Sequence, residues 1–303
     1  MLAILLSLVS AAGYGTSDFA AGLATRRASV IRVTLLAEGV CVAVVGVALA
    51  LTGAGPPSPR AVAWGSAAGL AGVAGALSLY LGFRHAAFSV AATLSAVGAA
   101  GFSVLAGLLL GERPTALALI GIALALPAIA GVSASAGGPE AEEATGASPP
   151  SPGKSAITGR RWVPAGVSYG LVAGACFALL FIGLNQAGSG SGLWPVFCSQ
   201  VAALLAVGCV AAFTGDLRLP EARGGRPAAV AGLTGGPGTI CFFIATHHGL
   251  LAVTAVITSL YPAVTIMLAR VMLGERLTAI RLAGLSLAAA SVALIAAGGA
   301  GAG

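Results

Sequence analysis

The chain has 303 residues, of which 58% are hydrophobic and only 8% are charged, whereas a typical soluble domain has about 25% charged residues. This composition excludes an ordinary soluble protein. The formal net charge of +6 does not indicate nucleic-acid binding either, because Lys154 is the sole lysine and the arginines stand singly or in pairs between apolar segments.

Runs of about 20 apolar residues recur along the chain, and this is the length that an α-helix needs to cross a hydrocarbon layer of about 30 Å. They predict an all-α polytopic membrane protein with ten transmembrane helices. The expected spans are 2–23, 30–52, 61–82, 86–110 and 115–133, and then 163–185, 193–214, 228–247, 249–273 and 279–298. The segment 134–162 between the halves is rich in Pro, Gly, Ser and Glu, so we expect a disordered linker there.

One phrase occurs twice in the sequence. Residues 110–115 read Leu-Gly-Glu-Arg-Pro-Thr, and residues 273–278, which lie 163 positions later, read Leu-Gly-Glu-Arg-Leu-Thr. At the same offset His85 matches His248 and Ser95 matches Thr258. The chain is therefore expected to contain one repeat at 1–133 and a second at 163–303. Because five helices per repeat is an odd number, the second repeat should enter the membrane upside down relative to the first.

The repeated phrase is in part turn chemistry, since a glycine suits the C-terminal end of a helix. The candidate turn residues are Gly111, Glu112 and Arg113 in the first half and Gly274, Glu275 and Arg276 in the second.

The basic residues predict the orientation of these helices. Twelve of them fall in connections on one side: Arg26, Arg27, Arg32, Arg84, Lys154, Arg160, Arg161, Arg218, Arg223, Arg226, Arg276 and Arg281. The opposite connections carry Arg60 and Arg113. Short basic loops stay in the cytoplasm, so both termini are expected outside.

Two carboxylates stand inside predicted spans, where a charge costs about 2.5–3.5 kcal/mol on insertion scales. Asp18 shares a helix face with Tyr14 and Ser17, so it either lines an aqueous path or pairs with Arg26 or Arg27 at the interface. Glu38 falls opposite Gln200 of the second repeat, and it either forms an asymmetric proton site or pairs with Arg32.

Thr254, Thr258, Tyr261 and Thr265 form a polar stripe at helical spacing in the ninth span. The stripe predicts either the lining of a pore or hydrogen bonds that hold helices together.

In the eighth span, Gly235, Gly236 and Pro237 predict a helix break near the middle of the membrane. A harmless kink is the alternative, and Pro195 and Pro262 are weaker candidates for a break.

Two five-helix halves whose fourth spans end in Leu-Gly-Glu-Arg-x-Thr resemble the drug/metabolite transporter superfamily, and more narrowly a protein with two EamA domains. The resemblance implies alternating access around a cavity between inverted halves, and transport of a small metabolite or an amino-acid-like or drug-like solute, often outward. The sequence does not name the solute.

We expect no enzyme activity, no cofactor and no metal, with the small-molecule solute and membrane lipid as partners and no nucleic acid. Monomer and homodimer stay open. The expected location is the bacterial inner membrane. A membrane-embedded enzyme acting on lipid-linked substrates and a passive channel are the alternative functions.

Overall fold

A computed structural model describes residues 1–85, 88–133, 159–273 and 278–300. Throughout these ranges the regular structure is α-helix. The helices of the first half are α1 (Leu2–Thr25), α2 (Val30–Thr52), α3 (Pro59–His85), α4 (Phe88–Leu109) and α5 (Ala116–Ser133). Those of the second half are α7 (Gly159–Gln186), α8 (Trp194–Phe213), α9 (Ala222–His248), α10 (Leu251–Thr258), α11 (Tyr261–Leu273) and α12 (Ala279–Ala300).

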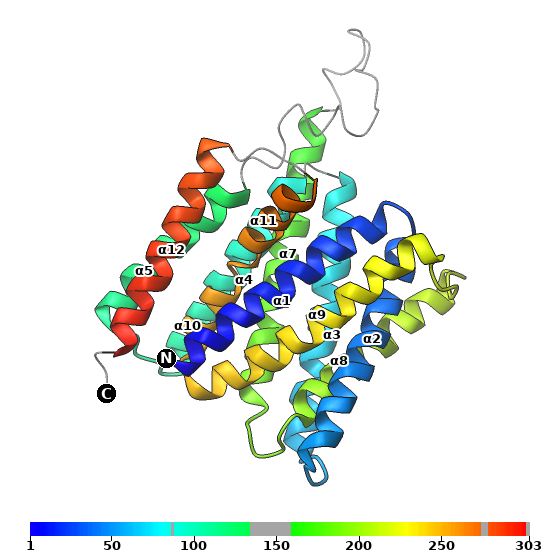
Figure 1. Ribbon diagram of the computed structural model, residues 1–303, viewed down its shortest axis with the longest axis horizontal. Helices are drawn as coiled ribbons and strands as arrows, with labels where there is room; N and C mark the ends of the chain where they lie inside the picture. The colour runs from blue at the N-terminus through cyan, green and yellow to red at the C-terminus, as the bar shows by residue number, and fades with distance from the viewer. Residues whose placement is uncertain (86–87, 134–158, 274–277, 301–303) are drawn as a thin grey trace.

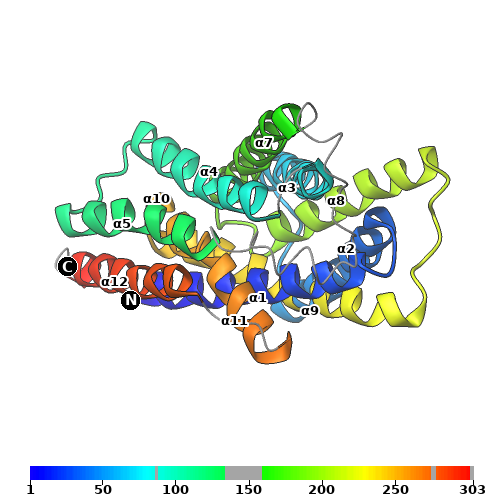
Figure 2. The ribbon, with the colours of Figure 1, turned by 90° about the horizontal axis from the view of Figure 1, so that it is seen from above.

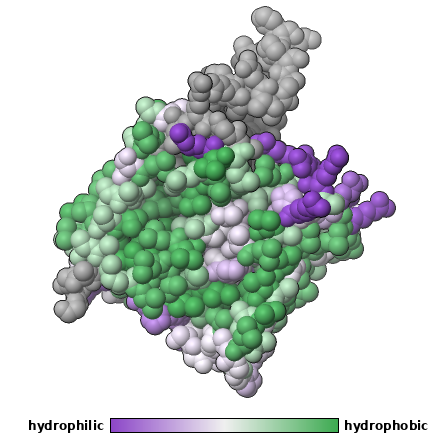
Figure 3. Space-filling model, viewed as in Figure 1, coloured by the Kyte–Doolittle hydropathy of each residue, from purple (hydrophilic) through white to green (hydrophobic). Residues whose placement is uncertain are grey.

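The helices are long and apolar enough for a polytopic membrane protein. Within the described ranges, seven segments have the length and composition to cross a membrane, the last of them spanning both α10 and α11. Three shorter apolar segments lie at Leu94–Leu109, Ala116–Gly131 and Leu282–Gly298. Large apolar side chains such as Leu51, which is 83% exposed, cover the outer surface (Figure 3), and they fit a lipid environment.

The two halves of the chain are interleaved. α1 packs most extensively on α9, α3 on α7, and α5 on α12, so each of these first-half helices has its main partner in the second half. Figure 1 shows α1 and α9 side by side, and α5 beside α12 at one side of the bundle. Figure 2 shows α5 and α12 from above, again at one side of the molecule. The core therefore lies at the seam between the halves.

Glycines allow this close approach of helices. A Cβ atom added to Gly69 of α3 would overlap the carbonyl oxygen of Ser199 in α8. A Cβ on Gly13 of α1 would lie 2.9 Å from the Cα of Gly238 in α9. Small residues of this kind let membrane helices gain van der Waals contact where hydrophobicity does not drive association.

The predicted break at Gly235, Gly236 and Pro237 is wrong. α9 continues without interruption through Pro237, because its glycines pack tightly on α1 and α2 and hold the helix in place around the missing hydrogen bond. A Cβ on Gly236 would lie 3.4 Å from Val45 of α2.

The helix is interrupted instead in the ninth span, between α10 and α11. Pro262 has no N–H to continue the helical ladder, and the N–H of Ala263 bonds to the carbonyl of Leu260 at 2.9 Å. Pro262, which the sequence suggests only as a weaker candidate for a helix break, is therefore the proline next to the interruption.

The first repeated turn has two structural roles. Gly111 adopts a φ of +88°, and the N–H groups of Gly111 and Glu112 bond back to Leu108 and Gly107 at 3.1 and 2.9 Å, which is the double hydrogen bond that ends a helix at a left-handed glycine. The Glu112 carboxylate then accepts hydrogen bonds from the N–H of Leu251 and, at 2.9 Å, from that of Ala252. It caps the N-terminal end of α10 in the other half, a role that turn chemistry alone does not predict. Gly274, Glu275 and Arg276 lie outside the described residues.

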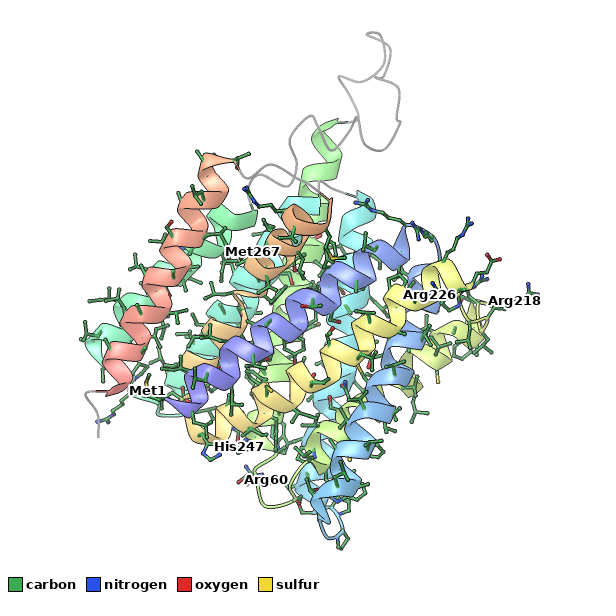
Figure 4. All side chains as sticks on the ribbon, viewed as in Figure 1. Met1, Arg60, Arg218, Arg226, His247 and Met267 are labelled. Atoms are coloured by element: carbon green, nitrogen blue, oxygen red, sulfur yellow. The ribbon has the colours of Figure 1, made fainter. Side chains whose placement is uncertain are left out.

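Arginine side chains lie at both ends of the bundle. Arg218 and Arg226 lie at one end, whereas Met1, Arg60 and His247 lie toward the other (Figure 4). The sequence likewise assigns Arg218 and Arg226 to one side of the membrane and Arg60 to the other. Exposed Arg113 is the second basic residue assigned to the side of Arg60. We call the end with Arg218 and Arg226 the basic end.

A polar cluster joins the halves at the basic end. The Asp216 carboxylate, just after α8, accepts hydrogen bonds from the Ser29 hydroxyl and the Arg32 guanidinium at the start of α2. The Ser29 hydrogen bond makes the largest contribution to the lowered pKa of Asp216, whose ordinary value is 3.8; burial opposes it, and a hydrogen bond and the charge of Arg32 lower the pKa further.

We expect Asp216→Asn to remove part of the pH dependence of stability. Because the folded-state pKa of Asp216 is lowered, its contribution is complete above the ordinary value and is lost as the pH falls through the folded-state pKa. The melting temperature of the wild type should therefore exceed that of the variant near neutrality, by a small margin because solvent reaches both side chains of the ion pair. The difference should shrink below about pH 4. A constant difference down to the lowest measurable pH contradicts the prediction.

Candidate functional site

A cavity of about 150 Å³ lies at the seam between the halves. Its walls come from α1, α2 and α3 of the first half and from α7, α8 and α9 of the second. Because both halves contribute, a relative movement of the halves would change the shape and the access of this cavity.

The cavity collects five of the residues that the sequence suggests for solute binding. Tyr14, Ser17 and Asp18 line it from α1, Glu38 lines it from α2, and Gln200 lines it from α8. The i, i+3, i+4 spacing places the three α1 residues on one helix face, as the sequence predicts. Glu38 and Gln200, which are expected at equivalent positions of the two halves, do face the same cavity.

Among the side chains that the structure describes, neither carboxylate of the cavity has a cationic partner. Arg32 forms its ion pair with Asp216, so the alternative interpretation that paired Glu38 with Arg32 is wrong. Arg27, a candidate partner of Asp18, donates instead to the carbonyl of Arg223 at 3.3 Å. The cavity therefore holds two carboxyl groups without a counter-ion from the described side chains.

Glu38 has an oxygen without a hydrogen-bond partner. Its Oε2 atom is buried and accepts no hydrogen bond from the described residues. A buried carboxylate oxygen is costly unless a donor reaches it. A proton or a hydrogen-bond donor at this oxygen would therefore stabilise the site.

Aromatic rings form the wall at the inner end of the cavity. The Tyr14 hydroxyl donates to Thr239 of α9 at 3.0 Å, which fixes the ring. The Tyr14 centroid lies 6.5 Å from that of Phe181, and Phe177 lines the cavity one helical turn away on α7. This wall gives an apolar body a surface to pack on, next to the carboxylates.

The cavity extends from the middle of the bundle toward the basic end. Tyr14 and Thr239 lie near the centres of α1 and α9, whereas Ala21 lies one turn before α1 ends and Val33 lies in the first turn of α2. Both of these helix ends adjoin the basic end.

The opposite end is held together by hydrogen bonds between the halves. The Trp194 indole donates to the carbonyl of Gly55 at 2.7 Å, and the Arg60 guanidinium donates to that of Gln186 at 2.8 Å. The Ser191 hydroxyl bonds to Ser58 at 2.9 Å. We call this set of contacts the distal seam.

Comparison with known proteins identifies the family. The model of the EamA-like transporter family matches residues 1–134 and 164–297, one match in each half. The chain belongs to the EamA-like transporter family. The two matches confirm the resemblance to a drug/metabolite transporter with two EamA repeats.

A solved structure described as "Crystal structure of protein" shares the fold of this EamA protein. The similarity covers 97% of this chain and 98% of the other, with a TM-score of 0.76 and 15% sequence identity. At this identity the likeness supports the fold alone. No curated protein matches the sequence.

The polar stripe of the ninth span does not line the cavity of this EamA protein. Thr254 and Thr258 are fully buried in α10, and Tyr261 packs in a core cluster with α4, α5 and α12. The Thr254 hydroxyl bonds to carbonyls of its own helix, while Thr265 donates to Gly15 of α1 at 3.0 Å. The Thr265 bond fits the alternative interpretation, hydrogen bonds that hold helices together, whereas the buried Thr258 hydroxyl has no partner among the described residues.

Several lining residues escaped the sequence analysis. Thr34, Cys41, Phe177, Ser199 and Thr239 all face the cavity. Thr239 carried a usable signal, since it is an isolated hydroxyl one turn after Gly235 in an apolar run. Phe177 carried none, because nothing in the sequence separates a cavity aromatic from a lipid-facing one.

Proposed function

We propose that this EamA protein is a secondary transporter of a small solute in the bacterial inner membrane, with ten membrane crossings in two inverted halves, and that the cavity at the seam is its solute site. The observation that carries the proposal is the pair of unpaired carboxylates, Asp18 and Glu38, in a cavity built by both halves. Intramembrane carboxylates are costly and are retained mainly where they serve a solute or a proton.

The proposed cycle exposes the cavity alternately to the two sides of the membrane. The arrangement described here corresponds to the state that faces the basic end, and the positive-inside rule makes that end cytoplasmic. Opening to the other side requires the distal seam to part. The hydrogen bonds of Trp194 and Arg60 would then break while the helices close around Ala21 and Val33.

Export driven by proton entry is the proposed direction. Asp18 and Glu38 would take up protons from outside when the solute leaves and release them to the cytoplasm when the solute binds. Gln200 cannot titrate, so the proton sites would belong to one half of an otherwise symmetric scaffold.

Solute counterflow with a cavity-filling variant tests the proposal. In proteoliposomes, a carrier should show saturable counterflow, and Ala76→Phe in the cavity wall of α3 should abolish it. Ala74→Phe is the matched control, because Ala74 lies on the same helix but is exposed on the outer surface. Flux without saturation or counterflow would indicate a channel, and unchanged counterflow in Ala76→Phe would remove the cavity from the transport path.

A further inference from the structure

The cavity is acidic. Asp18 and Glu38 line it, whereas no Lys, Arg or His is among the lining residues that the structure describes. Of the arginines near these carboxylates in sequence, Arg32 pairs with Asp216 and Arg27 donates to the carbonyl of Arg223, while Arg26 is exposed. In a medium of low dielectric constant, such a cavity favours cations and repels anions.

The hydrogen-bonding groups of the cavity also favour a cationic ligand. The buried Oε2 atom of Glu38 lacks a donor, and an ammonium or guanidinium group offers several N–H donors in a charge-assisted geometry. The lining offers an anion only neutral donors, such as the Gln200 amide and the hydroxyls of Ser17 and Thr34.

The walls and the volume of the cavity restrict the rest of the ligand. Phe177, Leu180 and the Tyr14 ring supply an apolar surface beside the carboxylates, and a ring face near a cation adds a further attraction. The volume of about 150 Å³ equals that of an engineered protein cavity that binds benzene.

We infer that the cavity takes a small organic cation, an amine or an amidine on an apolar body about the size of one benzene ring, and that it discriminates against zwitterionic amino acids. The identification of this ligand as the transported solute rests on the proposed function. An amino acid is disfavoured because its carboxylate would meet two carboxylates and no cationic side chain of the lining.

Four ligands with one ring and different charge test the inference. Benzylamine carries a cation, benzyl alcohol is neutral, benzoate is an anion, and phenylglycine is a zwitterion. Binding to the purified full-length protein in detergent is measured by calorimetry and by thermal shift, with benzamidine as a second cation. Benzylamine or benzamidine should bind at least about tenfold more tightly than benzyl alcohol, a preference expected for a charge-assisted hydrogen bond. Benzoate and phenylglycine should bind more weakly than either cation.

Two variants locate the binding to the cavity. Glu38→Gln and Asp18→Asn should each weaken binding of the cation by about tenfold or more while they change binding of benzyl alcohol by less than about twofold. Glu221→Gln is the matched control, because Glu221 is an exposed carboxylate at the start of α9, outside this cavity. It should leave all four affinities unchanged, and unchanged benzyl alcohol binding by the two cavity variants shows that their cavity stays folded.

The inference is overturned if neither cation binds, if phenylglycine or benzoate binds as tightly as benzylamine, or if both cavity variants retain the wild-type affinity. Counterflow of labelled benzylamine separates this failure from that of the proposed function. Binding without counterflow would keep the cation site and reject the carrier. Counterflow of an anionic or zwitterionic solute, with no cation binding, would reject the cation site and keep the carrier.

Discussion

Glu38→Gln is expected to lower the proton-driven accumulation of solute by about tenfold for each unit of pH gradient. If Asp18 and Glu38 each exchange one proton per cycle, a gradient of one unit can drive a concentration ratio of about 100 in the wild type. Replacing one carboxylate by an amide removes one coupled proton. Asp18→Asn should have the same effect, and the double variant should not accumulate solute at all.

The measurement is the equilibrium ratio of solute across a proteoliposome membrane whose electrical potential is clamped at zero. This ratio depends on the number of coupled protons and not on the affinity for the solute, so weaker binding in a variant slows the approach without changing the end point. Glu221→Gln should match the wild type. An unchanged ratio in both cavity variants would show that these carboxyl groups do not couple protons to transport.

Glu112→Ala is expected to destabilise the fold by about 3 kcal/mol, because it leaves two N–H groups at the start of α10 without an acceptor. Both residues that donate to this carboxylate, Leu251 and Ala252, are fully buried, so water does not replace the lost bonds. The carboxylate also complements the positive end of the helix dipole. Glu112→Gln keeps an acceptor and should cost only about 1 kcal/mol.

Reversible unfolding in mixed micelles measures these differences. Arg113→Ala is the control, because exposed Arg113 lies next to Glu112 in the same turn and should change stability by less than about 0.5 kcal/mol. If Glu112→Ala is no less stable than Arg113→Ala, the contact between the halves does not contribute to the fold, and the repeated phrase is turn chemistry alone.

The repeated phrase illustrates the limit of local reasoning. Gly111 was predictable, because a left-handed residue at a helix end favours glycine wherever the chain goes next. The partner of Glu112 was not, because the helix that it caps begins 139 residues further along the chain. No spacing rule within one half specifies which helix of the other half will lie beside a turn.

Contacts between distant helices also decide which span is interrupted. Four consecutive residues, Gly235, Gly236, Pro237 and Gly238, form the stronger local signal for a break, yet α9 stays continuous because the glycines pack against α1 and α2. The effect of a proline in a membrane helix depends on what the neighbouring helices can hold in place.

The sequence by itself determined that this is a helical membrane protein with two copies of one unit, because hydrophobic run length and internal similarity are local properties of the chain. It also determined that Tyr14, Ser17 and Asp18 share a face, since helical periodicity fixes which residues point the same way. Only the tertiary structure decided that this face meets Glu38 and Gln200 at a seam, that Arg32 turns to Asp216, and that Thr258 is buried away from the cavity. These outcomes depend on how closely helices from different halves approach, and that distance is set by side-chain volumes at contacts between distant parts of the chain.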